Sequence, residues 1–262
     1  MARRAFDVIA FDGDDTLWHN ERSYQAGRRQ FHRLLAAAGV DRSEQEIDEH
    51  VDRIELRNLG CYGYGVSSFV LSLIEAAIDL TGGRVTGTDL RTLTDLAKQM
   101  LTEDVELLDG AREAVTALAA SHPLMLITKG DLPHQTSKLD RSGLRGSFRF
   151  VEVVSTKTTP VYASVLARHG VDPSRVLMVG NSVRSDVLPV IELGGWAVHV
   201  PAALSWSHED AELPEPSRAR YRQLGSLTEL ADVVRRLEGD GLPGHVEGAA
   251  VPGPSSPPGL SR

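Results

Sequence analysis

The chain has 262 residues, of which 41% are apolar, so it can bury a sizeable core as one large domain or as a domain with an insertion. A formal net charge of −8 argues against a general nucleic-acid binder, and no apolar run approaches the roughly 18 residues of a membrane span. The one cysteine, Cys61, excludes an internal disulfide and fits a reducing compartment, so we expect a cytoplasmic monomer or homodimer.

Short apolar runs without polar alternation are typical of strands buried in a parallel sheet. Five such runs occur, at residues 7–11, 124–128, 151–155, 175–180 and 196–200. Helical patterns precede the second, fourth and fifth runs, at 110–122, 159–170 and 185–195. The alternation of strands and helices predicts an α/β fold with a doubly wound parallel sheet.

The interval from residue 17 to 107 breaks this alternation, because it contains no strand-like run. Residues 68–80 and 89–101 each place apolar side chains on one helical face. Ser43 and Glu46 have the spacing of a capping box at the start of a further helix. The sequence therefore predicts a bundle of roughly four helices inserted after the first strand.

The C-terminal region is expected to end in a surface helix at 226–237, where Ser226 and Glu229 form a second capping-box spacing. The residues after it are rich in Gly, Pro and Ser and lack periodicity, which is typical of a disordered tail. The expected division is a core of residues 1–17 and 106–238, a helical insertion of 18–105 and a tail of 239–262.

Polar residues follow the ends of the predicted strands. They are Asp12 and Asp14 after the first strand, Thr128 at the end of the second, Lys157 past the third and Asp186 past the fourth. Ligands of open parallel sheets bind at the carboxyl ends of the strands. The sequence therefore predicts that acidic, hydroxyl and cationic side chains meet at one edge of the sheet.

The segment from Asp12 to Asp15 holds three aspartates, whose charges repel one another. An acidic surface turn is one interpretation, but the buried strand before it and the polar ends of the other strands favour a metal site. Mg²⁺ prefers oxygen ligands, which Asp12 and Asp186 can supply. An EF-hand loop is disfavoured because Thr16 and Leu17 stand where it needs Asp or Asn and then Gly.

The same residues suit phosphoryl transfer. A carboxylate such as Asp12 can act as a nucleophile, and Asp14 can donate and accept the proton if like-charged neighbours favour its protonation. Lys157 offers positive charge to a phosphoryl group. The Thr128 hydroxyl and the backbone amide of Lys129 can donate hydrogen bonds to its oxygens.

Other polar residues nearby have simpler interpretations. Lys129 is alternatively a solvated turn residue that uses only its backbone N–H, and Lys138 is expected on an exposed helix. Ser182 and Ser185 either support the metal site or cap the helix that follows them, and capping is the favoured interpretation.

These residues resemble the four motifs of the haloacid dehalogenase (HAD) superfamily, in its phosphatase branch. Its Asp-x-Asp-x-Thr motif after an apolar strand matches residues 12–16, and its Ser or Thr at the next strand end matches Thr128. Its lysine matches Lys157, and its acidic cluster after a later strand matches residues 180–186. The resemblance covers about residues 6–201 and implies a Rossmann-like core with an inserted helical cap.

The resemblance also implies the catalytic roles. Asp12 would be the nucleophile and Asp14 the general acid and base, while Thr128 and Lys157 would bind the phosphoryl group. The dehalogenase branch of the family keeps the first aspartate but has no acid at the second position, so Asp14 favours phosphate chemistry.

By the same resemblance, Mg²⁺ would be held by Asp12, the backbone carbonyl of Asp14 and Asp186. The sequence departs from the pattern at Asn181, where the family often has an acid. An amide there can orient Asp186 or a metal-bound water but adds no charge.

Three functions stay open at this point. The first is Mg²⁺-dependent hydrolysis of a small phosphorylated metabolite through a phospho-aspartyl intermediate on Asp12. The second is a phosphotransferase or phosphomutase acting on sugar phosphates, and the third is a catalytically silent binding protein of the same fold. Specificity is expected to reside in the cap, including a flexible loop at 61–65, and the candidates are Trp18, His19, Asn20, Arg53, Arg57, Tyr62 and Tyr64.

Overall fold

The computed structural model describes residues 5–204, 206, 211–212 and 214–239. Within these residues six strands form one sheet, in the order β3-β2-β1-β4-β5-β6, and every neighbouring pair is parallel. The strands are β1 (Val8–Phe11), β2 (Leu124–Lys129), β3 (Phe150–Val154), β4 (Val176–Gly180), β5 (Trp196–His199) and β6 (Tyr221–Gln223). The predicted doubly wound α/β fold is confirmed.

The prediction of five strands was incomplete, because β6 was missed. This strand has only three residues, Tyr221–Gln223, and its side chains are half-buried or exposed at the edge of the sheet. A short polar strand pairs through backbone hydrogen bonds and carries no apolar run, so its sequence gives no strand signal.

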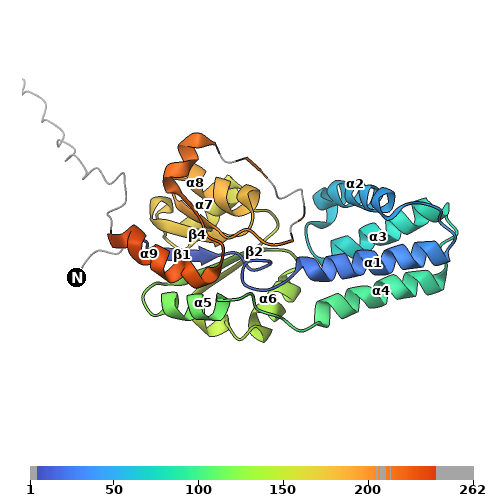
Figure 1. The fold of residues 1–262 in the computed structure, drawn as a ribbon, viewed down its shortest axis with the longest axis horizontal. Coiled ribbons are helices and arrows are strands. Elements are labelled where there is room, and N and C mark those ends of the chain that lie inside the picture. Colours follow the sequence, from blue (N-terminus) through green and yellow to red (C-terminus); the bar gives the residue numbers. More distant parts are fainter. Residues whose placement is uncertain (1–4, 205, 207–210, 213, 240–262) are drawn as a thin grey trace, which may run out of the picture.

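Helices cover both faces of the sheet (Figure 1). They are α5 (Ala111–Ala119), α6 (Leu132–Arg141), α7 (Thr159–Arg168), α8 (Leu188–Glu192) and α9 (Leu230–Gly239). Alternate residues of β1 point to opposite faces. Ile9 and Phe11 join the hydrophobic core beneath α5 and α9, whereas Val8 and Ala10 join the core beneath α7 and α8.

Four helices inserted between β1 and α5 form the cap, which lies beyond one end of the sheet (Figure 1). They are α1 (Glu21–Ala37), α2 (Glu44–Tyr62), α3 (Val66–Thr81) and α4 (Gly87–Thr102). Their apolar faces build a hydrophobic core of their own, centred on residues such as Phe31, Phe69 and Leu73. The predicted capping box is present at the start of α2, where Ser43 Oγ accepts from Glu46 N at 3.2 Å.

Some predicted boundaries were wrong. The expected loop at 61–65 is shorter, because α2 continues to Tyr62 and leaves only Gly63, Tyr64 and Gly65 before α3. Ser226 forms no capping box; it accepts from Thr228 N at 3.3 Å and starts a 3₁₀ turn ahead of α9. Gly239 ends α9, and the rest of the expected tail, 240–262, lies outside the described residues.

In the part of the chain that the structure describes, no helix combines the length and the apolar character needed to cross a bilayer.

Candidate active site

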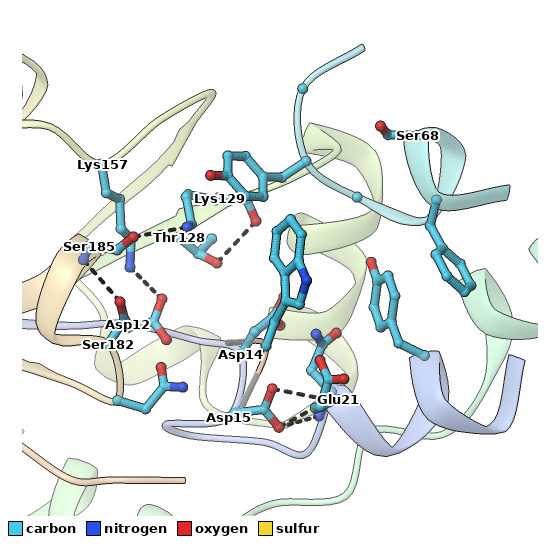
Figure 2. A pocket seen from close by; sticks show the side chains of 18 of the residues that line it. Asp12, Asp14, Asp15, Glu21, Ser68, Thr128, Lys129, Lys157, Ser182 and Ser185 are labelled. Atoms are coloured by element: carbon cyan, nitrogen blue, oxygen red, sulfur yellow. Dashed lines mark hydrogen bonds and ion pairs between the residues drawn. The ribbon is translucent and has the colours of Figure 1, made fainter. Parts of the chain in front are cut away.

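The carboxyl ends of three strands bring Asp12, Lys157 and Asp186 together. Lys157 Nζ donates to Asp12 Oδ1, and it donates to Asp186 Oδ1 at 2.7 Å. The exposed fractions of these residues are 6%, 5% and 1%, so the cluster is almost closed to bulk water (Figure 2). The sequence predicted this meeting of strand ends, and the structure places the three side chains in direct contact.

The turn after β4 holds Asp186 in place. The chain forms a π-helical turn at Val183–Val187, in which Ser182 Oγ accepts from Ser185 N at 2.9 Å, so Ser182 caps the turn as predicted. Ser185 does not stand at the cap position; its hydroxyl accepts from Lys129 Nζ at 3.0 Å beside the cavity. Ser182 N in turn donates to Asp186 Oδ2 at 3.0 Å. A Cβ atom on Gly180 would lie 2.3 Å from the Asp186 carboxyl, so only glycine lets this carboxylate fold back over the strand end.

The cluster is short of positive charge. Burial raises the pKa of Asp12 to about 7, although the charge of Lys157 opposes the shift and the charge of Asp186 adds to it. Burial would lower the pKa of Lys157, but Asp12 and Asp186 together hold it well above its usual value. One lysine therefore neutralises only one of two buried carboxylates.

The donor set around Asp12 fits Mg²⁺. Among the described residues no three acidic, histidine or cysteine side chains gather closely enough to form a metal site by themselves. Mg²⁺ is commonly held by only one or two carboxylates, with water and substrate oxygens completing the octahedron. Asp12 and Asp186 supply those carboxylates, Asn181 lines the same cavity, and a divalent cation would supply the missing positive charge.

Thr16 and Asn181 lie beside the nucleophile position. Thr16 Oγ1 donates to Asp12 Oδ2 at 3.0 Å and lies 3.3 Å from Asn181 Oδ1. The backbone carbonyl of Asn181 is held by His199 Nε2 at 2.9 Å. The amide that replaces the expected acid is therefore fixed against the first motif.

Thr128 and Lys129 line the same cavity from the end of β2. Thr128 is fully buried, and within the described part of the chain its hydroxyl makes only a long hydrogen bond of 3.5 Å, to the carbonyl of Lys129. Lys129 Nζ donates to Ser185 Oγ at 3.0 Å and lies 4.1 Å from the centroid of the Tyr64 ring. The alternative of a solvated turn residue is wrong for Lys129, because its side chain reaches across the site.

The prediction that the neighbours of Asp14 favour its protonated form was wrong. Its Oδ1 accepts from Trp18 Nε1 at 2.7 Å and from Lys138 Nζ at 2.8 Å, and its Oδ2 accepts from Gln135 Nε2 at 2.8 Å. Burial raises the pKa of Asp14, but the Lys138 charge and these three donors outweigh burial and hold it below its usual value. The neighbours thus favour the carboxylate, not the protonated acid that we expected.

Lys138 was also predicted to lie on an exposed helix, and this was wrong. It is 7% exposed, and besides Asp14 it contacts Asn20 Oδ1 at 2.6 Å. Gln135 and Lys138 lie three residues apart on α6 and so share the helix face that points toward β1. This spacing, on a helix that begins right after β2, was the signal in the sequence.

Asp15 has a structural role that the sequence did not indicate. Its backbone adopts φ of 57°, in the left-handed region that non-glycine residues rarely enter. Its Oδ1 accepts from Asn20 N at 2.9 Å, and its Oδ2 accepts from Glu21 N at 3.0 Å. The third aspartate of the motif therefore anchors the start of α1 instead of joining the metal cluster.

A cavity of about 160 Å³ opens between the strand ends and the cap. Of the cap residues predicted to contact substrate, Asn20 and Tyr64 line it, whereas Trp18 is fully buried against Asp14. His19, Arg53, Arg57 and Tyr62 do not line it. On the cap helices, the lining residues that the sequence missed are Glu21, Tyr24, Arg28, Glu55, Leu59, Ser68 and Phe69.

These missed residues sit on three helices whose patterns show ordinary amphipathic faces. Which turn of each helix borders the site depends on how the helices pack, so the sequence offered no local signal for them.

Comparisons with known proteins give one family. The model of the haloacid dehalogenase-like hydrolase family matches residues 6–194. A haloacid dehalogenase-like family hydrolase from Xanthomonas campestris is 37% identical with a TM-score of 0.80, over 90% of this chain and 94% of that one. The curated proteins give no match.

More distant structures share the fold. YfnB, a Bacillus subtilis HAD-family protein bound to magnesium, is 19% identical with a TM-score of 0.62, over 89% of this chain and 100% of that one. L-2-haloacid dehalogenase from Xanthobacter autotrophicus is 20% identical with a TM-score of 0.58, over 88% of this chain and 98% of that one.

Proposed function

Because the chain belongs to the haloacid dehalogenase-like hydrolase family, we propose that it is a Mg²⁺-dependent phosphatase that hydrolyses the phosphomonoester of a small metabolite. The observation that carries the proposal is the buried cluster of Asp12, Asp186 and Lys157 beside Asp14. A nucleophile, a cation and a second carboxylate for proton transfer thus border one cavity, as phosphoryl transfer requires.

Asp12 acts as the nucleophile. Its carboxylate oxygen forms a bond to phosphorus while the bond from phosphorus to the ester oxygen breaks, which gives an acyl phosphate and an alkoxide. Lys157 holds Asp12 at its Oδ1, and Thr16 donates to Oδ2, so the carboxylate is oriented before substrate binds. Water then attacks phosphorus, which releases phosphate and restores Asp12.

Asp14 handles the proton in both half-reactions. In its present contacts it is ionised, which suits it to take a proton from the attacking water in the second half-reaction. In the first it must carry the proton that it gives to the departing alkoxide. That step requires its hydrogen bond from Lys138 to loosen, because this cation favours the ionised form.

The remaining charge comes from the neighbouring strand ends. Lys157, Lys129 and the Thr128 hydroxyl border the space in which the phosphoryl oxygens would lie. Mg²⁺, held by Asp12, Asp186 and the backbone carbonyl of Asp14, would supply further positive charge against the phosphoryl oxygens.

The cavity suits a small ester. Its volume of about 160 Å³, with the phosphoryl-binding side chains at one end, has room for a small phosphorylated molecule.

The test is the Asp12→Asn variant with Mg²⁺ and a panel of small phosphate esters. We expect phosphate release to fall at least roughly a thousandfold, since an amide cannot form the acyl phosphate. Asp104→Asn, an exposed acid elsewhere in the chain, is the matched control and should keep its rate. A near-normal rate in Asp12→Asn would end the assignment.

The same panel separates the alternatives. Transfer of the phosphoryl group to an added sugar phosphate, in place of release as phosphate, would make the protein a transferase or mutase. Chloride release from 2-chloropropionate without phosphatase activity would place it with the dehalogenases. No turnover of any ester by the wild type with Mg²⁺ would leave a binding protein.

A further inference from the structure

The half of the cavity formed by the cap is rich in carboxylates. Glu21 from α1 and Glu55 from α2 both line it. Arg28 lines it as well, but its guanidinium is already committed: it donates to Asp52 at 2.6 Å and to Glu55, and it lies 3.4 Å from Asp48. Among the described residues this arginine is therefore outnumbered by the carboxylates around it.

The Glu21 carboxylate accepts no hydrogen bond from a described residue, and Arg28 compensates its charge only in part. Its backbone N–H donates to Asp15, but among the described residues no donor reaches its side chain. Burial raises the pKa of Glu21 to about 7, and the charge of Asp15 raises it further, while Arg28 opposes the shift. Burial likewise raises the pKa of Glu55 to about 7. Both carboxylates would gain from a positive charge in the cavity.

Ser68 is a further polar group in this half of the cavity. It is only 5% exposed, yet it lines the cavity, and no described residue bonds to its hydroxyl. Figure 2 shows Ser68 and Glu21 on the side of the pocket away from Lys157. The Ser68 hydroxyl is not among the fully enclosed polar atoms that lack a partner in the described residues, so it is open to a ligand or to water in the cavity.

Aromatic rings complete this half of the cavity. Tyr24 and Phe69 line it with ring centroids 4.9 Å apart. Aromatic faces attract cations, and Arg28 already lies 6.0 Å from the centroid of the Phe69 ring. Carboxylates beside aromatic faces make a surface that accepts an organic cation.

We propose that this half of the cavity, formed by Glu21, Glu55, Ser68 and Tyr24, binds an organic ammonium group. The preferred substrate is then the phosphomonoester of a small amino alcohol, with its phosphoryl end at Asp12 and its ammonium end at Glu21. This inference rests on the proposed phosphatase function and adds to it the chemical class of the leaving group.

Small phosphate esters with an ammonium, a hydroxyl or a carboxylate tail differ in how their charge interacts with this half of the cavity. An ammonium group offsets the negative charges of Glu21 and Glu55 and lies against an aromatic face. A hydroxyl can donate to the same acceptors but leaves the repulsion among the carboxylates unrelieved. A carboxylate tail would add a like charge beside Glu21.

The test compares esters of one length that differ in the charge of the tail: 3-aminopropyl, 3-hydroxypropyl and 2-carboxyethyl phosphate. We expect the wild-type enzyme with Mg²⁺ to prefer the ammonium ester over the hydroxyl ester in kcat/KM by roughly tenfold, the worth of one charge-assisted hydrogen bond. The carboxylate ester should be the poorest. Equal or better use of the hydroxyl ester would overturn the proposal.

Variants locate the effect. Glu21→Gln should remove most of the preference for the ammonium ester, while Glu49→Gln, an exposed glutamate on α2, should retain it. Retention of the preference in Glu21→Gln would also overturn the proposal. The comparison of esters on the wild type needs no variant, so a variant that fails to fold does not weaken the test.

Failure of the ammonium site and failure of the proposed phosphatase function give different results. If the wild type hydrolyses a generic aryl phosphate but shows no preference among the three esters, only the ammonium site is wrong. If it hydrolyses no ester, the phosphatase assignment fails. Calorimetric binding of the three esters to the Asp12→Asn protein then still decides whether the ammonium tail is favoured.

Discussion

Two aspartates that are two positions apart have opposite pKa shifts because their cationic neighbours differ. Asp12 shares Lys157 with Asp186, so burial dominates and raises its pKa to about 7. Asp14 receives Lys138 together with two neutral donors, which outweigh burial and lower its pKa. The number of carboxylates per lysine thus decides the charge state at each residue.

The buried ion pair between Lys138 and Asp14 can be tested with the Lys138→Met variant. The side chains of Lys138 and Asp14 are 8% and 24% exposed, and removing the cation leaves a largely buried carboxylate without its ion pair. We expect the free energy of unfolding, measured by urea titration near pH 7, to fall by about 2 kcal/mol. Lys98→Met is the control, because Lys98 pairs with Asp95 on an open surface and should show no measurable change. Equal losses in both variants would contradict the prediction.

A second prediction concerns pH and Glu21. Burial raises its pKa from 4.5 to about 7, so the folded state binds this proton more tightly than the unfolded state between those values. Its ionisation therefore lowers the free energy of unfolding as pH rises from about 4.5 through 7. Glu21→Gln should be more stable than wild type by about 2 kcal/mol at pH 8, allowing for partial solvent screening.

The two proteins should converge below about pH 4, where Glu21 is protonated in both the folded and the unfolded state. Chemical denaturation across this pH range measures the difference, with Glu49→Gln as the control. A gap between wild type and Glu21→Gln that does not change with pH would show that burial of the charge is not its cause.

The link between α2 and α3 is a segment where the cap contacts the core. Gly63, Tyr64 and Gly65 line the cavity, and at the start of α3 Ser67 Oγ donates to Asp131 at 3.1 Å. Gly65 has φ of 128°, and an added Cβ would lie 2.8 Å from Asp131 Oδ2. The close approach of cap to core at this point depends on the absence of a side chain.

Two glycine substitutions on this element should have opposite effects. Gly65→Ala is expected to lower the free energy of unfolding by about 1–3 kcal/mol and to reduce kcat/KM, because the backbone is strained and the link moves away from Asp131. Gly60→Ala lies inside α2 with open space around it, so it should stabilise the protein by about 0.5–1 kcal/mol. Thermal unfolding of both variants checks this, and a stable, fully active Gly65→Ala would contradict it.

At the scale of the whole molecule, the candidate site lies between two separately packed bodies. One set of apolar residues forms the cores on the two faces of the sheet, and another forms the core of the cap. The phosphoryl position belongs to the strand ends, whereas the acidic half of the cavity belongs to the cap. In the function that we propose, the reacting groups and the groups that select the substrate therefore lie in different parts of the fold.

Mg²⁺ should stabilise the whole molecule, because it binds the folded arrangement of Asp12 and Asp186 and not the unfolded chain. The protein is first freed of metal with EDTA. Addition of Mg²⁺ at about ten times its dissociation constant should then raise the unfolding temperature by about 3 °C. The Asp186→Asn variant should lose this rise. NaCl at the same ionic strength is the control, and an equal rise with NaCl would point to charge screening alone.

The sequence by itself determined the buried strands of the sheet, the position of the inserted helices and the residues at the strand ends. Those features are local, because an apolar run predicts a strand and the residue after it lies at the sheet edge. The sequence alone therefore indicates Asp12, Thr128, Lys157 and Asp186 as site residues, and it also indicates the helical character of the cap.

Only the tertiary structure decided the contacts between distant segments. Lys138 reaches Asp14 across 124 positions, and Glu21, Glu55 and Ser68 meet at one cavity through the packing of three helices. The edge strand β6 pairs through its backbone, which side-chain patterns do not report. Pairing and packing depend on which surfaces meet in space, and that information is not local to any stretch of the chain.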